Sequence, residues 1–167
     1  GQIDILVNNA GVAGPLGLIT AISKQAWDDT LRINLTGMFL CAREVLKPMM
    51  TRRTGNIINL SSGAGLKTLR VRSLPYGISK WGVEGLTYAL AVQMKPYGIC
   101  VNALRPGPHD TGMHQETPPE WRTGAWQHLR KPNGVSMLAV ELALHTVDTM
   151  TGEAIDFVTW EQQARQG

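Results

Sequence analysis

The sequence predicts an α/β fold in which a doubly wound parallel sheet carries helices on both faces. Two observations predict it. Short apolar runs alternate with longer helical patterns along the 167 residues, and the connections between the runs are too long for hairpins. Polar and glycine-rich clusters follow these runs, and in such sheets ligands bind outside the carboxyl ends of the strands. With 43% hydrophobic and 17% charged residues, the composition is typical of a globular domain.

The first predicted strand is the apolar run Ile3–Val7, which ends in the turn residues Asn8-Asn9-Ala10-Gly11. A short and nearly unbroken apolar run is typical of a strand that is buried on both faces. We therefore expect this strand to have neighbours on both sides in the sheet.

Two helical patterns follow the first strand. Ser23 is a suitable N-cap for a helix that begins near Lys24. The second pattern repeats apolar residues at spacings of three and four between Leu31 and Met49. We expect it to end at Arg52-Arg53-Thr54-Gly55, where basic residues precede a glycine.

The rest of the chain continues the alternation. It contains strands at Asn56–Leu60, Ile99–Leu104 and Ala154–Val158, and helices at Tyr76–Lys95 and Val135–His145. We interpret residues 108–132, which hold four prolines and two tryptophans, as an irregular flap with a short helix near Glu120–His128. A polar tail is expected after the last strand.

Charge and composition argue against several classes of protein. The basic residues are scattered and the formal charge is only +3, which disfavours a nucleic-acid binder. No apolar run approaches the roughly 20 residues of a membrane span, and the first residues do not form a signal peptide, so we expect a soluble cytoplasmic protein. Cys41 and Cys100 suit buried reduced thiols, and the four histidines lack metal-ligand spacing, so no metal site is predicted.

Tyr76-Gly77-Ile78-Ser79-Lys80 is the first pattern that carries chemistry. Four residues along a helix place Tyr76 and Lys80 on one face. An ammonium beside a phenol favours the phenolate, so Lys80 should lower the pKa of Tyr76 toward neutrality and make it a usable general acid or base. The alternative is a surface pair without function.

Ser62 and Asn34 are further candidates. Ser62 ends a strand fourteen residues before Tyr76, and its hydroxyl could donate to a substrate oxygen that gains negative charge. Taken alone, a turn serine is the better interpretation. Asn34 stands inside a helical pattern, where asparagine is a poor helix former, so a functional and a satisfied buried asparagine are equally supported.

Together these pieces resemble the classical short-chain dehydrogenase/reductase family. The matching stretches are Asn8-Asn9-Ala10-Gly11, Ile33-Asn34-Leu35-Thr36-Gly37, Ile58-Asn59-Leu60-Ser61-Ser62, the pair Tyr76 and Lys80, and Val101-Asn102-Ala103-Leu104-Arg105-Pro106-Gly107 followed by Thr111. The resemblance covers residues 1 to about 113 strongly and 126–156 more loosely. It implies that residues 1–167 form a single partial domain, the C-terminal portion of a Rossmann-like sheet.

The resemblance implies a hydride transfer between nicotinamide, as NAD or NADP, and a small carbonyl or alcohol substrate. Tyr76 would be the acid/base, and Lys80 would lower its pKa and bind the nicotinamide ribose. Ser62, or less suitably Ser61, would hold the substrate oxygen, and Asn34 would hold a water that joins Lys80 to solvent. The residues expected beside the cofactor are Asn8, Asn9, Ala10, Gly11, Tyr76, Lys80, Pro106, Gly107 and Thr111.

The family also forms homo-oligomers through two long helices per subunit. These helices would be the ones that hold Asn34–Met49 and Tyr76–Lys95. We therefore expect a dimer or tetramer of the full-length protein, with no nucleic-acid or membrane partner.

The chain departs from the family in two places. The family opens with a strand, a Gly-x-x-x-Gly-x-Gly turn and a helix that hold the pyrophosphate, whereas this chain begins at the family's fourth strand. We expect the isolated chain to be inactive. The alternative is that it is a truncated, catalytically inactive short-chain dehydrogenase/reductase fragment that binds a partner or has no function. The second departure follows Ala154-Ile155-Asp156, where the family continues into an Asp-Gly-Gly turn and this chain reads Phe157-Val158-Thr159-Trp160.

Two sets of residues outside these motifs could contact a substrate. Lys67, Arg70 and Arg72 could bind an anionic group or form a solvated loop, and the solvated loop is the preferred interpretation. Trp121 and Trp126 in the flap could line a substrate pocket or simply pack, with neither preferred.

Overall fold

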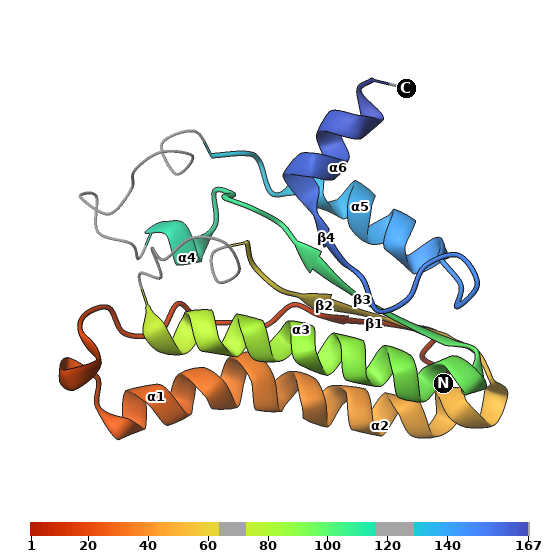
Figure 1. Ribbon diagram of the computed structural model, residues 1–167, viewed down its shortest axis with the longest axis horizontal. Coiled ribbons are helices and arrows are strands. Elements are labelled where there is room, and N and C mark those ends of the chain that lie inside the picture. Colours follow the sequence, from red (N-terminus) through yellow and green to blue (C-terminus); the bar gives the residue numbers. More distant parts are fainter. Residues whose placement is uncertain (64–72, 116–128, 167) are drawn as a thin grey trace.

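A computed structural model describes residues 1–63, 73–115 and 129–166. Its sheet has four parallel strands in the order β1-β2-β3-β4, which confirms the predicted fold class. The strands are β1 (Ile5–Asn8), β2 (Gly55–Leu60), β3 (Ile99–Arg105) and β4 (Ala154–Asp156). Helices cover both faces of the sheet, with α1, α2 and α3 on one side and α5 on the other (Figure 1).

The helices agree with the predicted patterns, apart from their ends. Their bounds are α1 (Lys24–Leu31), α2 (Gly37–Arg52), α3 (Leu74–Met94), α4 (Gly112–Gln115), α5 (Asn133–Leu144) and α6 (Phe157–Ala164). A π-helical turn at Arg32–Thr36 joins α1 to α2, and single 3₁₀ turns lie at Ile19–Ala21 and Lys95–Tyr97. As predicted, Ser23 caps α1, since its Oγ accepts from the amide of Ala26 at 3.1 Å.

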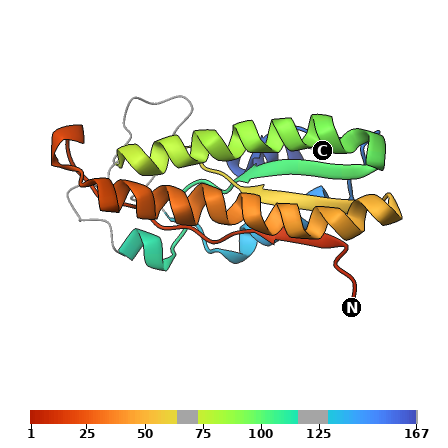
Figure 2. The ribbon, with the colours of Figure 1, turned by 90° about the horizontal axis from the view of Figure 1, so that it is seen from below.

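Two apolar layers hold the sheet, one on each face. Ile57 of β2 is fully buried against α2 and α3, whereas its neighbour Ile58 is fully buried against α5. Successive side chains of a strand point to opposite faces, so a strand covered on both sides must be apolar at every position. The first layer also contains Met49 and Val101, and the second contains Leu138 and Phe157. Figure 2 shows that α1 and α2, which follow each other through the π-helical turn, run side by side with α3.

The first strand lies at an edge of the sheet. Among the described residues β1 pairs with β2 alone, from Ile5 opposite Asn56 to Asn8 opposite Asn59. Ile5 and Val7 are 48% and 47% exposed, so the burial on both faces that the apolar run predicted is not found here. The strand order of the family places the second neighbour of this strand in the segment before the family's fourth strand, so an unpaired outer edge agrees with the expectation for this chain.

The predicted end of the second helix is corrected in detail. Arg53, and not a glycine, takes the left-handed conformation after α2, with φ 56°. Gly55 instead opens β2 in close contact with the helix, because a Cβ there would lie only 2.4 Å from Sδ of Met49.

The C-terminal prediction is also corrected. The expected strand Ala154–Val158 ends at Asp156, and the expected polar tail is helix α6. Asp156 causes this change because its carboxylate accepts from the amides of Val158 and Thr159 at 3.0 and 3.1 Å, which is an N-cap. The short helix α4 was not predicted. The helix predicted near Glu120–His128 lies outside the described residues.

Two features are missing from the described ranges. None of the described helices is long and apolar enough to cross a membrane. Among the residues with described positions, no group of three or more His, Cys, Asp or Glu side chains could hold a metal ion.

Candidate active site

A cavity of about 590 Å³ lies at the carboxyl edge of the sheet. It gathers residues from the ends of all four strands, from the first turns of α3, and from the segment that follows β3. The predicted site residues in its lining are Asn9, Gly11, Ser62, Tyr76, Lys80, Pro106, Gly107 and Thr111. Asn8, Ala10 and Asn34 are not part of this lining.

Tyr76 lies in the first turn of α3. Ser73 caps this helix, since its Oγ accepts from the amide of Tyr76 at 3.4 Å, and Pro75 suits the first turn. The Tyr76 hydroxyl forms a hydrogen bond with Ser62. Burial raises the pKa of Tyr76 above its usual value, and the hydrogen bond with Ser62 opposes this rise without cancelling it.

Lys80 lies one turn further along the same face of α3. It is only 4% exposed, and its Nζ donates to the carbonyl of Leu60 at 2.7 Å. Nζ lies 5.6 Å from the centre of the Tyr76 ring. Burial lowers the pKa of Lys80 to about 8. The structure therefore differs from the prediction that Lys80 lowers the pKa of Tyr76, because burial dominates and Ser62 is the group that opposes it.

The two neighbouring serines have different partners. Ser62 contacts Tyr76, whereas Ser61 is buried and its Oγ donates to Oε1 of Glu84 at 2.7 Å. Glu84 also accepts two hydrogen bonds from Arg105, both at 2.7 Å. Sequence reasoning missed Glu84, although its position one turn after Lys80 on the same helix face was a usable signal.

Asn34 is fully buried in the π-helical turn. Its Oδ1 accepts from the amide of Val12 at 2.8 Å, and its Nδ2 donates to the carbonyl of Val12 at 2.9 Å and to Oγ of Ser79 at 3.0 Å. Its side chain thus fixes the backbone after β1 and joins it to α3. A Cβ on Gly11 would lie 3.4 Å from Oδ1 of Asn34 and 3.7 Å from Nζ of Lys80, so this segment passes close beside the lysine.

Asn8 fixes the end of β1 from the other side. Its Nδ2 donates to Oδ1 of Asn59 at 2.9 Å, and Nδ2 of Asn59 donates to Oγ1 of Thr87 at 3.0 Å. Side-chain hydrogen bonds thereby join β1 to β2 and β2 to α3. Asn9 and Gly11, which line the cavity, follow this anchored end of β1 in the sequence.

His109 is a lining residue that the sequence gave no reason to select. It is buried, and its Nδ1 lies 3.3 Å from the carbonyl of Gly107. A carbonyl can only accept, so this contact is a hydrogen bond in the tautomer that carries its hydrogen on Nδ1. The ring packs on Phe157 with centroids 5.4 Å apart. Its Nε2 is buried and has no hydrogen-bond partner among the described residues.

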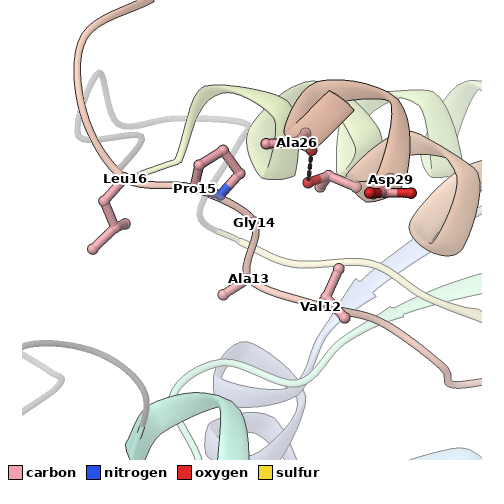
Figure 3. Close-up of a pocket in the computed structure, with 8 residues that line it drawn as sticks. Val12, Ala13, Gly14, Pro15, Leu16, Ala26 and Asp29 are labelled. Carbon is pink, nitrogen blue, oxygen red and sulfur yellow. Dashed lines mark hydrogen bonds between the residues drawn. The ribbon is translucent and has the colours of Figure 1, made fainter. Parts of the chain in front are cut away.

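A second hollow, of about 400 Å³, lies beside the segment after β1 (Figure 3). It is lined by Val12–Leu16 and by Ala26, Asp29 and Thr30. Gly14 is required here, because its φ is +71° and a Cβ would lie 2.7 Å from Oγ1 of Thr30. The carboxylate of Asp29 already accepts from Gln25 and Arg32. The groups suited to chemistry therefore belong to the first cavity.

The first cavity offers three donors to a ligand oxygen or hydroxyl. Tyr76 and Ser62 present hydroxyls that already contact each other. Within the described ranges Lys80 donates only to Leu60, so two of its three ammonium hydrogens remain for a ligand such as a ribose. Gly107 also lines the cavity, and its φ of +73° is a backbone conformation that favours glycine. This arrangement suits proton transfer to an oxygen held at Ser62.

Several predicted contacts cannot be placed. The loop residues Lys67, Arg70 and Arg72 and the flap residues Trp121 and Trp126 lie outside the described residues.

Known proteins are similar to this chain in sequence and in fold. The family model described as short chain dehydrogenase matches residues 1–121. A 3-alpha-(or 20-beta)-hydroxysteroid dehydrogenase of Mycobacterium tuberculosis is 38% identical over 152 residues, which are 91% of this chain and 58% of that protein. Of the solved structures, a 3-oxoacyl-[acyl-carrier protein] reductase of Brucella melitensis with bound NAD superimposes with a TM-score of 0.78 at 30% identity.

A gluconate 5-dehydrogenase of Burkholderia cenocepacia, in complex with NADP and tartrate, superimposes with a TM-score of 0.82 at 28% identity. This chain is covered to 92% by the Brucella match and to 93% by the Burkholderia match. It spans 60% and 63% of those chains, which is less than two thirds of their length.

Proposed function

The chain belongs to the short-chain dehydrogenase family, and from this premise we propose that it is the catalytic part of an NAD(P)-dependent oxidoreductase. Its substrate would be a small molecule with a carbonyl or hydroxyl group. The observation that carries the proposal is the contact of Tyr76 with Ser62 beside the buried Lys80, in a cavity at the carboxyl edge of the sheet. The bound NAD and NADP of the two similar structures support a nicotinamide cofactor.

In the proposed reaction the nicotinamide, when bound, supplies or accepts the hydride. Ser62 donates a hydrogen bond to the substrate oxygen and holds it next to Tyr76. In the direction of reduction, Tyr76 gives its proton to that oxygen. Because burial raises the pKa of Tyr76, the phenol stays protonated near neutral pH, which is the form that a proton donor needs.

We assign Lys80 to the cofactor's ribose, because it lines the cavity together with Asn9 and Gly11, and a Cβ on Gly11 would lie 3.7 Å from its Nζ. Pro106, Gly107 and Thr111 would contact the nicotinamide end. Asn34 would act through the backbone of Val12, which its side chain holds. Its Oδ1 accepts one hydrogen bond and could accept a second from the proposed water.

Replacement of Tyr76 tests this proposal. In a protein that joins this chain to a complete cofactor-binding half, Tyr76→Phe should lower kcat by about 10²-fold or more, because positioned proton transfer contributes roughly 10²–10⁴-fold. Steady-state kinetics with NADH and NADPH would give kcat, and calorimetry should show nearly unchanged cofactor affinity. The matched control is Tyr88→Phe, which removes an exposed hydroxyl from the same helix.

A Tyr76→Phe protein that keeps more than about a tenth of its kcat would exclude Tyr76 as the acid/base. A separate outcome is that the unsubstituted protein itself shows no turnover with carbonyl and alcohol substrates. In that case the alternative of an inactive, partner-binding or non-functional chain would replace the proposal.

A further inference from the structure

Glu84 makes three short hydrogen bonds at the back of the candidate site. Its carboxylate accepts from Oγ of Ser61 and from two nitrogens of Arg105, each at 2.7 Å. The side chains of Glu84 and Arg105 are only 15% and 22% exposed. We call the group of Ser61, Glu84 and Arg105 the carboxylate clamp.

The clamp joins three elements that meet at the cavity. Glu84 belongs to α3, Ser61 directly follows β2, and Arg105 is the last residue of β3. The amide of Ser61 also donates to the carbonyl of Leu104 at 2.8 Å, so Ser61 is held by its backbone to β3 and by its side chain to α3.

Each strand-end residue in the clamp directly precedes a residue of the site. Ser61 precedes Ser62, and Arg105 precedes Pro106. Tyr76 lies on the same helix as Glu84, two turns earlier. The clamp therefore links the strand end that precedes Ser62 to the helix that carries Tyr76.

We propose that Glu84 is a positioning residue, whose carboxylate ties the ends of β2 and β3 to α3 and so holds Ser62 within hydrogen-bonding reach of Tyr76. The inference rests on the proposed role of Tyr76 as the proton donor. Its test, however, needs neither cofactor nor substrate, so it stands or fails independently of turnover.

The charge and the geometry of Glu84 have opposite consequences for Tyr76. Removing the negative charge, and leaving Arg105 as an unpaired cation, would favour the phenolate and lower the pKa of Tyr76. Loss of the Ser62 hydrogen bond would raise it, because that bond opposes the effect of burial. The sign of the change therefore separates a positioning role from a purely electrostatic one.

The experiment is a titration of Tyr76 in four forms of the chain joined to a complete cofactor-binding half: unsubstituted, Glu84→Gln, Ser62→Ala and the double variant. Incorporated 3-fluorotyrosine would report the tyrosines by fluorine NMR, with the Tyr76 signal assigned from Tyr76→Phe. Fluorine lowers the pKa of a phenol and so brings the titration to less alkaline pH. We expect Glu84→Gln to shift the Tyr76 pKa upward, by no more than Ser62→Ala does.

In the Ser62→Ala background, Glu84→Gln should shift the pKa of Tyr76 downward or not at all, since no bond to Ser62 remains to be lost. The matched control is Glu44→Gln, which removes an exposed carboxylate that pairs with Arg43 and Lys47 on α2. It should leave the Tyr76 titration unchanged.

A fall or no change of the Tyr76 pKa in Glu84→Gln would overturn the proposal, and so would an equal rise in both backgrounds. If Glu84→Gln does not fold, Ser61→Ala decides the question. It removes one arm of the clamp and leaves the Glu84–Arg105 pair in place, so a smaller rise is expected and no rise would contradict the inference.

Discussion

Buried amide side chains hold the residues of the site in place. Asn34 saturates both backbone groups of Val12, and Asn59 links Asn8 to Thr87. Asn102 of β3 likewise binds backbone groups before β4, because it donates to the carbonyl of Met150 and accepts from the amide of Glu153. Removal of one of these asparagine side chains would leave the backbone groups that it binds unsatisfied, at about 1–3 kcal/mol each. The asparagines of the family's motifs thus act here as scaffold.

Lys80 should make the stability of the protein depend on pH. Burial lowers its pKa from 10.5 to about 8. Above about pH 8 the folded protein loses this proton while the unfolded chain keeps it, so the free energy of unfolding rises with pH. The raised pKa of Tyr76 acts in the opposite sense only above its ordinary value of 10.0.

We therefore expect the unsubstituted protein to gain about 2–3 kcal/mol relative to Lys80→Met between pH 8 and 10. Urea unfolding at several pH values in that window would measure it. The matched control, Lys47→Met, removes an exposed cation on α2 and should leave the slope unchanged. Parallel stability curves for the unsubstituted and Lys80→Met proteins would contradict the expectation.

At the scale of elements, α6 is where the chain departs from the family's pattern, which continues into an Asp-Gly-Gly turn at this point. Asp156 ends β4 and caps α6, and the first residue of the helix, Phe157, packs in the layer beneath α5. The same Asp156 and Val158 line the cavity. The helix therefore contributes a wall of the site as well as cover for the sheet.

Loss of the Asp156 cap should destabilise the protein. Asp156→Ala removes the acceptor for two helix amides, and we expect a loss of about 1 kcal/mol in the free energy of unfolding. Asp156→Asn keeps a capping side chain and should cost much less. Chemical denaturation would measure both. Equal losses would show that the negative charge beside Arg105, and not the cap, is what matters.

The outer faces of α2 and α3 carry a second expectation at this scale. Large apolar side chains stand exposed there, among them Phe39, Leu40, Trp81, Tyr88 and Val92. Neighbouring exposed apolar residues mark interaction surfaces, and the two helices run alongside each other (Figure 2). We expect these helices to form the subunit interface of a dimer or tetramer.

Tyr88→Glu together with Val92→Glu should shift a protein with a complete cofactor-binding half toward monomers, because two charges would be buried at the interface. Light scattering at micromolar concentration would measure the mass. Leu18→Glu, at an exposed apolar position away from both helices, is the control. A purely monomeric unsubstituted protein would refute the interface.

At the scale of the whole molecule, the outer edge of β1 is exposed. In the part of the chain that the structure describes, β1 has a partner on one side, and Ile3, Ile5 and Val7 are about half exposed. An apolar strand with an unpaired edge is a site of aggregation. The cofactor contacts proposed for the cavity are those to the nicotinamide end, and the 167 residues show no pattern of a glycine-rich phosphate loop before a helix.

We therefore expect the 167-residue chain alone to be poorly stable and to bind dinucleotides weakly. Calorimetric titration with NADH and NADPH, after a check of cooperative unfolding, would test this. A soluble and cooperatively folding chain with micromolar affinity for either would show that another segment of this chain, or a second chain, supplies the phosphate site.

The sequence by itself determined the class of fold, the strands of the interior and most of the residues that are proposed for the site. Ile57 and Ile58 are apolar because both faces of β2 are covered, and this leaves a continuous apolar run that can be read locally. Ser23 before α1 and the spacing of Tyr76 and Lys80 are local in the same sense, because a cap and a helix face depend only on residues a few positions apart.

Only the tertiary structure decided what depends on distant neighbours. The partners of Glu84 come from positions 61 and 105, on two different strand ends, and no local pattern brings them together. The exposure of β1 depends on its place in the sheet, and the start of α6 depends on where Phe157 packs. The pKa of Tyr76 is raised although Lys80 is near, because the burial that sets it is a property of the assembled cavity and not of the helix.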